Sequence, residues 1–258
     1  MCRHLAYLGP PVSLAELLLQ SSNSLLRQSW APGDMRGGGT VNADGFGVGW
    51  YPPDGREPVR YRVDRPMWSD VNFAALAEVT RSPAVLASVR SATIGMPVVE
   101  TAAAPFSDDG WLFAHNGVVR GWPESVAHLA GEVPVANLLT MDAPMDSALL
   151  WVLLRHRLRK GADPAEAVTS LVADVAEASP MSRLNLLLTD SEQIVATTWT
   201  HSLWTRVGPG RVEVSSEPGD DDPAWTEVPD RHLVLARPSE VDLRPLAEAA
   251  GGPTTGAR

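Results

Sequence analysis

The order of its secondary-structure patterns is the feature that most restricts what this chain can fold into. Two helical patterns stand next to each other, over residues 146–159 and 164–178. In the first, an apolar face runs from Leu149 to Leu154; in the second, Asp163 stands at the N-cap position with Glu166 in capping-box spacing. Strand patterns lie before and after this pair, so the two helices interrupt a strand-rich chain.

The strand patterns are short apolar runs bounded by turn residues. Shorter helices are predicted over 14–19, with Ser13 as the cap, and over 70–80. Because helices and strands do not alternate, a doubly wound parallel sheet is not expected, and the chain is predicted to be an α+β protein with mostly antiparallel sheets. The predicted strands cover residues 2–8, 46–51, 84–89, 110–116, 183–188, 193–199, 203–207, 211–215 and 232–236.

Turn residues predict where several strands end. We expect the first strand to stop at Gly9-Pro10-Pro11, and the strand over 110–116 to break at Asn116-Gly117, the strongest short hairpin signal. An irregular stretch ends in the glycine run at 37–39, and the glycines within 45–49 indicate a strand that another backbone approaches closely. The acidic Pro/Gly segment 217–223 is predicted to be a solvated loop.

The chain of 258 residues contains no internal repeat and no linker that would divide it. We therefore expect a single domain over residues 2–250 and a disordered tail at 251–258. A net charge of −10 argues against nucleic acid as a partner. The oligomeric state stays open, with a homo-oligomer as one option.

Several absences in the sequence bear on where the protein works. No apolar run is long enough for a membrane span, and the first residues do not resemble a signal peptide. A single cysteine cannot form an internal disulfide, which suits a reducing compartment. We therefore expect a cytoplasmic protein that does not enter a membrane.

Cys2 is the only cysteine, and removal of Met1 would place it at the N-terminus. Its thiol and its α-amine would then share one Cα, and both titrate near neutral pH, at about 8.5 and about 7.7–8.0. The amine is able to accept the thiol proton directly or through one water, which forms the nucleophilic thiolate. The alternative is a lone cysteine that acts as a small buried hydrophobe.

Three other places carry candidate chemistry, each with a structural alternative. Arg90 follows an apolar strand, which favours contact with an anion, although a surface arginine that ends the strand is equally compatible. Asn116 and Gly117 offer a side-chain amide and a backbone N–H, the donors of an oxyanion hole, or else they form a hairpin turn. Asp146 begins a helix, where the helix dipole alone favours a carboxylate.

Other chemistries have little support in the sequence. The six histidines form no H-x-x-x-H pair, and only Cys2-x-His4 has metal-ligand spacing, so no metal or other cofactor is expected. There is no G-x-S-x-G or P-loop motif, and Lys160, the sole lysine, ends a surface helix. What remains is the chemistry centred on Cys2.

Five pieces, in this order along the chain, together resemble the glutaminase domain of class II amidotransferases, members of the N-terminal-nucleophile hydrolase superfamily. They are Cys2, NADGFG at 42–47, RSATIG at 90–95, FAHNG at 113–117 and DS at 146–147. The resemblance implies a four-layer αββα sandwich of two mostly antiparallel sheets. It also implies a γ-glutamyl amidohydrolase in which Cys2 is the nucleophile and no cofactor takes part.

The same resemblance implies roles for the other candidate residues. The Asn116 side chain and the Gly117 N–H form the oxyanion hole. Arg90, assisted by Thr93, binds the α-carboxylate of a γ-glutamyl group, and Asp146 binds its α-ammonium group. The expected partner is therefore a small γ-glutamyl substrate.

The sequence departs from the class II pattern at three places. Ala102-Ala103-Ala104-Pro105 stands where the family has Asn-x-His-Pro, Ile94 replaces a common histidine, and Ala148 replaces the usual glutamate. We expect these changes to make the pocket less polar and roomier near the leaving group. They argue against glutamine as the substrate.

A closer resemblance, over nearly the whole chain, is to the γ-glutamyl amidohydrolases of the ergothioneine pathway. It rests on CRHL at 2–5, VRSATIGMP at 89–97, APFSD at 104–108, and SEP at 216–218 with DDDP at 220–223. It implies hydrolysis of γ-glutamyl-hercynylcysteine S-oxide to hercynylcysteine S-oxide and glutamate. Two alternatives remain: a glutaminase subunit that passes ammonia to a partner synthase, and a γ-glutamyl-binding protein without catalytic activity.

Overall fold

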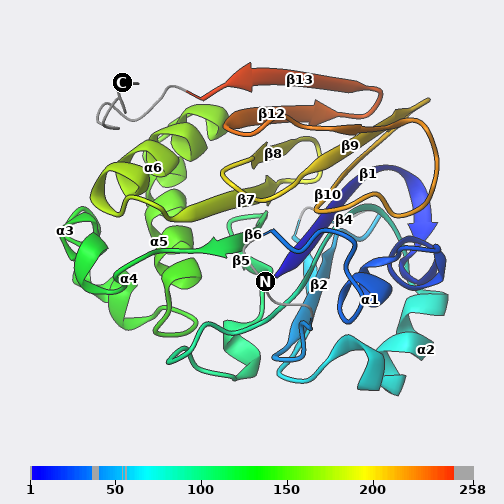
Figure 1. Ribbon diagram of the computed structural model, residues 1–258, viewed down its shortest axis with the longest axis horizontal. Coiled ribbons are helices and arrows are strands. Elements are labelled where there is room, and N and C mark those ends of the chain that lie inside the picture. Colours follow the sequence, from blue (N-terminus) through cyan, green and yellow to red (C-terminus); the bar gives the residue numbers. More distant parts are fainter. Residues whose placement is uncertain (1, 37–40, 54, 56, 247–258) are drawn as a thin grey trace, which may run out of the picture.

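Two antiparallel β-sheets, stacked face to face, form the centre of the molecule (Figure 1). The computed structural model describes residues 2–36, 41–53, 55 and 57–246. The glycine run at 37–39 and the predicted tail at 251–258 lie outside the described residues. Within the described chain, seven strands form the first sheet and six form the second.

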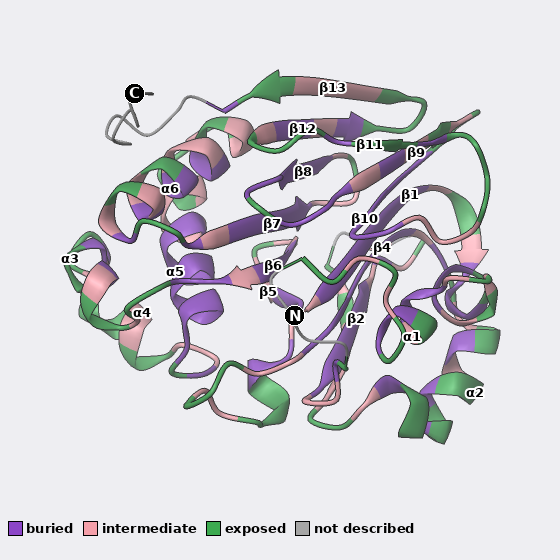
Figure 2. Cartoon of the chain, viewed as in Figure 1, coloured by how far each residue is buried: buried purple, intermediate pink, exposed green. Residues whose placement is uncertain are grey.

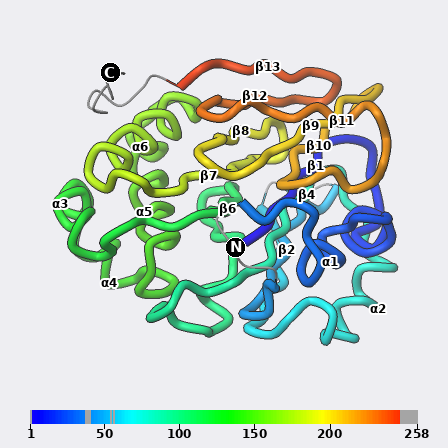
Figure 3. The backbone as a smooth tube through the Cα atoms, in the orientation of Figure 1, coloured from blue at the N-terminus to red at the C-terminus, as the bar shows by residue number. Residues whose placement is uncertain are grey.

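Strand order in both sheets brings distant parts of the chain together, as the tube in Figure 3 shows for the N-terminal strand. The first sheet has the order β11 (Trp225–Glu227), β9 (Trp204–Gly208), β10 (Arg211–Ser215), β1 (Arg3–Ser13), β4 (Arg81–Val89), β2 (Phe46–Trp50) and β3 (Val59–Val63). The second has the order β13 (Glu240–Pro245), β12 (His232–Arg237), β8 (Ile194–Thr197), β7 (Arg183–Thr189), β6 (Trp111–Val118) and β5 (Phe106–Asp108).

Helices cover the outer face of each sheet and complete four layers (Figure 1). The first sheet carries η1 (Glu16–Gln20), α1 (Leu25–Gln28) and α2 (Val71–Val79), and the second carries α5 (Asp146–Arg159) and α6 (Pro164–Ala178). This confirms the α+β class and the αββα sandwich. The remaining helical turns are η2 (Met67–Ser69), η3 (Glu100–Ala102), η4 (Glu124–Val126), α3 (Ala127–Ala130) and α4 (Val135–Leu139).

Helix ends follow the capping residues that the sequence offers. The Asp163 side chain accepts hydrogen bonds from two backbone N–H groups in the first turn of α6, and the Asp70 side chain accepts one in α2. The Ser13 hydroxyl likewise accepts the Glu16 N–H, although the turn that follows is a π-helix. No helix in the described part of the chain is both long and apolar enough to cross a bilayer.

Three apolar clusters hold the layers together, and Figure 2 shows how deeply the central elements are buried. Between the sheets, Leu86 of the first packs in one cluster with Leu187 of the second. Under α5, the ring of Trp151 stacks on Phe113 of β6, with ring centres 5.6 Å apart. The two large rings bury apolar surface between α5 and the second sheet, which holds the helix against it.

Two strands run further than their turn residues predict. β1 does not stop at Gly9-Pro10-Pro11 but continues to Ser13, with a register shift against β4 after Leu8. Such an irregularity suits prolines, which have no N–H to donate to the ladder. β6 does not break at Asn116-Gly117, because β7 pairs with it through Asn116 and Gly117 as far as Val118. The expected strand end and the expected hairpin are both wrong.

The glycines of β2 confirm the predicted close approach of another backbone. A Cβ at Gly47 would lie 2.4 Å from the backbone oxygen of Ala104, and one at Gly49 would lie 2.7 Å from the Leu112 side chain. Only glycine fits these positions without a shift of the neighbours. The segment that carries Ala104 is thereby held against the first sheet.

The segment 217–223 is not simply the solvated loop that its composition predicts. Glu217 is 3% exposed and forms an ion pair with Arg3, and Asp220 pairs with Arg206. Asp221 and Asp222 agree with the prediction because they lie at the surface. Composition alone misses the burial of Glu217, since its partner stands 214 residues earlier.

Candidate active site

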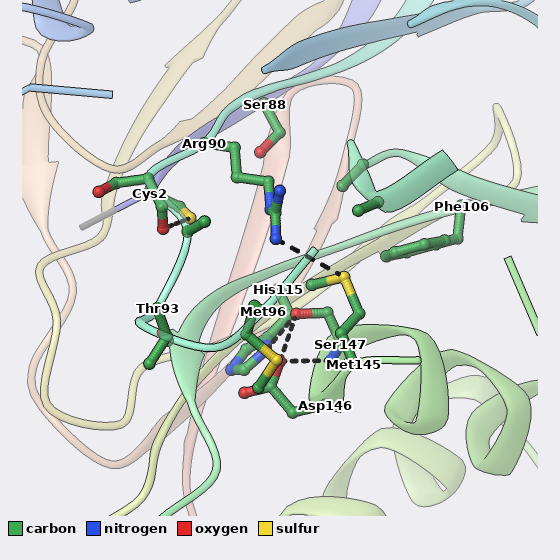
Figure 4. A pocket seen from close by; sticks show the side chains of 15 residues that line it. Cys2, Ser88, Arg90, Thr93, Met96, Phe106, His115, Met145, Asp146 and Ser147 are labelled. Atoms are coloured by element: carbon green, nitrogen blue, oxygen red, sulfur yellow. Dashed lines mark hydrogen bonds between the residues drawn. The ribbon is translucent and has the colours of Figure 1, made fainter. Parts of the chain in front are cut away.

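Five of the six predicted site residues line one narrow cleft of about 30 Å³ (Figure 4). The elements that supply them meet there: Cys2 precedes β1, Arg90 follows β4, Gly117 lies in β6 and Asp146 begins α5. The fifth residue, Thr93, comes from the loop after β4. Other lining residues include Ser88, Met96, Ala102, Ala104, Phe106, His115, Met145 and Ser147.

Cys2 is a free, partly exposed thiol at the wall of the cleft. Its Sγ lies 3.7 Å from the carbonyl oxygen of Ser91. The Cys2 carbonyl accepts a hydrogen bond from Nη1 of Arg3, at 3.0 Å. These contacts hold the residue immediately before the central strand of the first sheet.

Arg90 carries a buried positive charge that points into the cleft (Figure 4). Its backbone is fixed by the Arg90 N–H donating to Gly45 and by its carbonyl accepting from the Asp44 N–H. The guanidinium has only long contacts, 3.5 Å to the Asp44 carbonyl oxygen and 4.0 Å to the Met145 sulfur. Among the described residues no carboxylate pairs with it, so an anionic ligand would complete its coordination.

Asp146 supplies the opposite charge in the same cleft. Its carboxylate accepts the N–H of Val119 at 2.9 Å and that of Ser147 at 2.7 Å, which fixes its orientation at the start of α5. The side chain is buried, and no arginine, lysine or histidine of the described chain forms an ion pair with it. A buried carboxylate of this kind favours a cationic ligand.

The sequence analysis does not identify His115 and Ser147 as part of the site. His115 Nε2 lies 2.8 Å from the carbonyl oxygen of Arg183, which only accepts, so Nε2 carries the proton. Nδ1 then accepts from the Ser147 hydroxyl, at 2.9 Å. Burial lowers the pKa of His115 and favours this neutral form, while the charge of Asp146 acts in the opposite direction. The alternation of positions 113, 115 and 117 along one strand face is the signal that predicts His115.

Asn116 is the one predicted site residue outside the cleft lining. Residues alternate across β6, so its side chain lies on the other face of the strand from His115 and Gly117. Its Nδ2 lies 3.5 Å from the hydroxyl oxygen of Ser216, and its Oδ1 has no hydrogen-bond partner in the described structure. The Asn116 amide is buried, and Ser216 connects it to the start of β1, because the Ser216 hydroxyl accepts the His4 N–H.

The three departures from the class II pattern have different structural consequences. Ala102 and Ala104 line the cleft, as expected for a less polar pocket. Ile94 is fully exposed, so its replacement of a histidine does not make the cleft lining apolar. Ala148 is buried beneath the site in α5.

Comparison with known sequences gives a consistent picture. The chain matches the family described as glutamine amidotransferases class-II over residues 15–213. A relative named gamma-glutamyl-hercynylcysteine sulfoxide hydrolase, from Mycolicibacterium smegmatis, is 43% identical over 246 residues, or 95% of this chain and 100% of the relative. A relative of the same name from Mycobacterium tuberculosis is 40% identical, over 97% of this chain and 99% of the relative.

A solved structure agrees with the architecture. The glutamine aminotransferase class-II domain protein from Silicibacter pomeroyi has a TM-score of 0.69 to this chain, and the match covers 95% of this chain and 100% of that one. Its sequence identity is 24%, so the similarity concerns the fold.

Proposed function

The chain belongs to the class II glutamine amidotransferase family, and on that premise we propose that it hydrolyses the γ-glutamyl amide bond of γ-glutamyl-hercynylcysteine S-oxide. The products are glutamate and hercynylcysteine S-oxide. The two mycobacterial relatives, similar over nearly the full length of this chain, support this substrate.

Recognition of the glutamyl group uses the two opposite charges of the cleft. The substrate α-carboxylate pairs with the Arg90 guanidinium, assisted by the Thr93 hydroxyl, and the α-ammonium group pairs with Asp146. Both groups are bonded to the same α-carbon, so holding them fixes that carbon and directs the side chain that carries the γ-carbonyl. The flexible side chains of Met96 and Met145 allow the narrow cleft to adapt to the ligand.

The reaction begins at Cys2 after removal of Met1. The α-amine takes the thiol proton, and the thiolate attacks the γ-carbonyl carbon to form a tetrahedral oxyanion, which the Asn116 amide and the Gly117 N–H stabilise. The C–N bond then breaks as the α-ammonium group of Cys2 protonates the leaving nitrogen. Water hydrolyses the remaining glutamyl thioester, which releases glutamate and regenerates the thiol.

The observation that carries this proposal is the buried Arg90, which no carboxylate of the described residues pairs with, in the same cleft as Asp146 and the only thiol of the chain. A cation and an anion that face one cavity without neutralising each other are suited to a zwitterionic head group. The γ-glutamyl group is such a head group, and its carbonyl is the electrophile that a thiolate requires.

The decisive experiment measures free glutamate after incubation with γ-glutamyl-hercynylcysteine S-oxide and, separately, with glutamine. We expect rapid release from the first compound and slow release from the second. The Cys2→Ala variant is expected to keep the fold and lose turnover, because no other thiol is present. An intact mass spectrum of the parent is expected to lack Met1.

Each other outcome contradicts a defined part of the proposal. Release of glutamate by Cys2→Ala at the parent rate would show that the nucleophile is another group. Faster release from glutamine would favour the glutaminase alternative. Binding of the γ-glutamyl compound without any release would favour the non-catalytic alternative, as would a mature chain that retains Met1.

A further inference from the structure

The segment that follows β10, Ser216 and Glu217, lies directly behind the N-terminal residues. The Ser216 N–H donates to the His4 carbonyl at 2.9 Å, and the His4 N–H donates to the Ser216 hydroxyl oxygen at 3.0 Å. The first bond continues the backbone contact of β1 with β10 by one residue toward Cys2, and the second adds a side-chain contact at the same place. The proposed reaction assigns no role to this segment.

Glu217 and Arg3 form an ion pair that is almost completely removed from solvent. Arg3 Nε lies 2.8 Å from Glu217 Oε1, and the two side chains are 2% and 4% exposed. The second carboxylate oxygen accepts the Gly33 N–H at 2.7 Å. Both oxygens of Glu217 are therefore held, and the carboxylate has one defined orientation.

The Arg3 guanidinium links Glu217 to Cys2, the proposed nucleophile. Besides Glu217, it donates from Nη1 to the Cys2 carbonyl and from Nη2 to the Asp34 carbonyl. The three acceptors arrive from three separate parts of the chain, and one of them belongs to the residue that carries the thiol. The planar guanidinium fixes their relative positions, which a flexible ammonium group would not do.

Burial of this pair is not explained by stability alone. Removing two charges from water offsets most of their mutual attraction, so an apolar pair of similar volume is often as stable as a buried ion pair. A charged pair at such a place is better explained by the geometry that it imposes. The geometry imposed here is that of the Cys2 backbone.

Ser216 contacts Asn116, whose side-chain amide is the proposed donor to the oxyanion. Its hydroxyl oxygen accepts the His4 N–H, so its own proton is free to be donated, and the Asn116 amide lies 3.5 Å away. Donation to the amide oxygen would turn the Asn116 NH₂ group away from Ser216. This orientation also provides a partner for the amide oxygen of Asn116, which otherwise has none in the described structure.

We propose that Ser216 and Glu217 are positioning residues for the reaction, with Glu217 orienting Cys2 through Arg3 and Ser216 orienting the Asn116 amide. This inference rests on the proposed function, because it assigns both residues to the same glutamyl transfer. It predicts a loss of kcat with little change in KM, since neither residue touches the Arg90 and Asp146 charges that bind the glutamyl group.

The first test replaces both members of the pair, in Arg3→Met/Glu217→Leu. Removing both charges avoids an unpaired buried charge, so the protein is expected to fold with a Tm close to that of the parent. Misplacement of Cys2 is expected to lower kcat about 100-fold, with KM within about threefold of the parent value. The matched control, Arg244→Met/Asp242→Leu, removes an exposed pair of β13 and is expected to keep the parent kcat.

The second test concerns Ser216 and has a control on the neighbouring residue. Ser216→Ala is expected to lower kcat about tenfold at an unchanged KM. Ser215→Ala removes a buried hydroxyl one residue away that has no hydrogen-bond partner in the described structure, and it is expected to keep the parent kcat. A Ser216→Ala enzyme as active as Ser215→Ala would overturn the assignment of Ser216.

A measurement without substrate separates this inference from the proposed function. The rate at which iodoacetamide alkylates Cys2, measured at one pH for the parent and the variant, reports access to the thiol. Release of the Cys2 backbone in Arg3→Met/Glu217→Leu is expected to raise this rate about tenfold. A parent that hydrolyses no γ-glutamyl compound refutes the proposed function, whereas parent-like alkylation, or parent-like kcat, in the folded double variant refutes the role of the pair.

Discussion

At the scale of single residues, the Arg90 guanidinium is a buried charge that no carboxylate of the described residues neutralises. It is 5% exposed, and its contacts in the described chain are a carbonyl oxygen and a thioether sulfur at long distances. A buried charge without a partner destabilises the folded protein. The protein therefore retains an unfavourable group at the place where the substrate carboxylate is proposed to bind, which is typical of functional sites.

Replacement of Arg90 is expected to separate binding from stability. Arg90→Met removes the unpaired charge at similar side-chain length, so the Tm is expected to stay at or above the parent value. Loss of charged hydrogen bonds to the substrate carboxylate is worth about 1.5–3 kcal/mol, so KM for the γ-glutamyl substrate is expected to rise about 10- to 150-fold. Steady-state kinetics and thermal unfolding measure the two effects on one sample.

The control for Arg90 stands at the other end of the same strand. Arg81 is exposed at the start of β4, and Arg81→Met is expected to leave KM unchanged. A parent-like KM in Arg90→Met would contradict the proposed carboxylate site. A large fall in Tm would instead show that Arg90 has a stabilising partner.

At the scale of elements, β2 illustrates how glycine positions the wall of the cleft. Gly47 faces the backbone of Ala104, and Ala104 lines the cleft. The missing Cβ allows this segment to lie against the sheet, so a strand that contributes none of the proposed site residues still determines the shape of the site. The contact also explains why this strand contains two glycines, although glycine disfavours strands.

Gly47→Ala is expected to destabilise the protein by about 1–3 kcal/mol, because the new methyl group meets a backbone oxygen that cannot move independently. Urea unfolding measures this change. Gly208→Ala in β9 is the matched control, since its new methyl group would meet only the flexible Arg211 side chain. Equal stability of the two variants would show that the segment with Ala104 is able to shift.

At the scale of the whole molecule, the interior includes histidines that remain uncharged. His4 and His201 are buried, and none of their four ring nitrogens has a hydrogen-bond partner in the part of the chain that the structure describes. Burial lowers the pKa of each to about 3, and the neighbouring histidines and Arg3 add to the effect for His4. Packing of the two layers therefore depends on neutral imidazoles.

This burial predicts how stability depends on pH. A histidine titrates near 6.5 in the unfolded chain and near 3 here, so between these values the unfolded state binds more protons. The stability that these two histidines contribute is therefore fully present above pH 6.5 and falls as the pH drops toward 3. Each of the two residues contributes a slope of up to about 1.4 kcal/mol per pH unit in this window.

The measurement is urea unfolding at several pH values between 7.5 and 4.5. His4→Phe is expected to flatten the dependence, because it removes one titrating group while keeping a ring of similar size. His128 lies at the surface, and His128→Phe is expected to retain the parent slope. A parent-like slope in His4→Phe would show that His4 does not stay neutral in the folded protein.

The sequence alone predicted the elements whose signals are local. α5 and α6 begin and end close to the predicted residues, because caps and apolar periodicity lie within one or two turns. The resemblance to class II amidotransferases likewise identified Cys2, Arg90, Thr93, Gly117 and Asp146, which line the cleft. Their catalytic and binding roles stay predictions until the variants are measured.

Only the tertiary structure decided what depends on distant partners. The short strands β3, β5, β11 and β13 were not predicted, since weak local patterns become strands when a neighbour supplies the ladder. Pairing with β7 likewise keeps Asn116 and Gly117 within β6, against their own turn preference. The burial of Glu217 depends on Arg3, 214 residues away. Residue types and short-range spacing determine chemistry and local conformation, whereas hydrogen bonds and burial between distant segments determine which chemical groups meet.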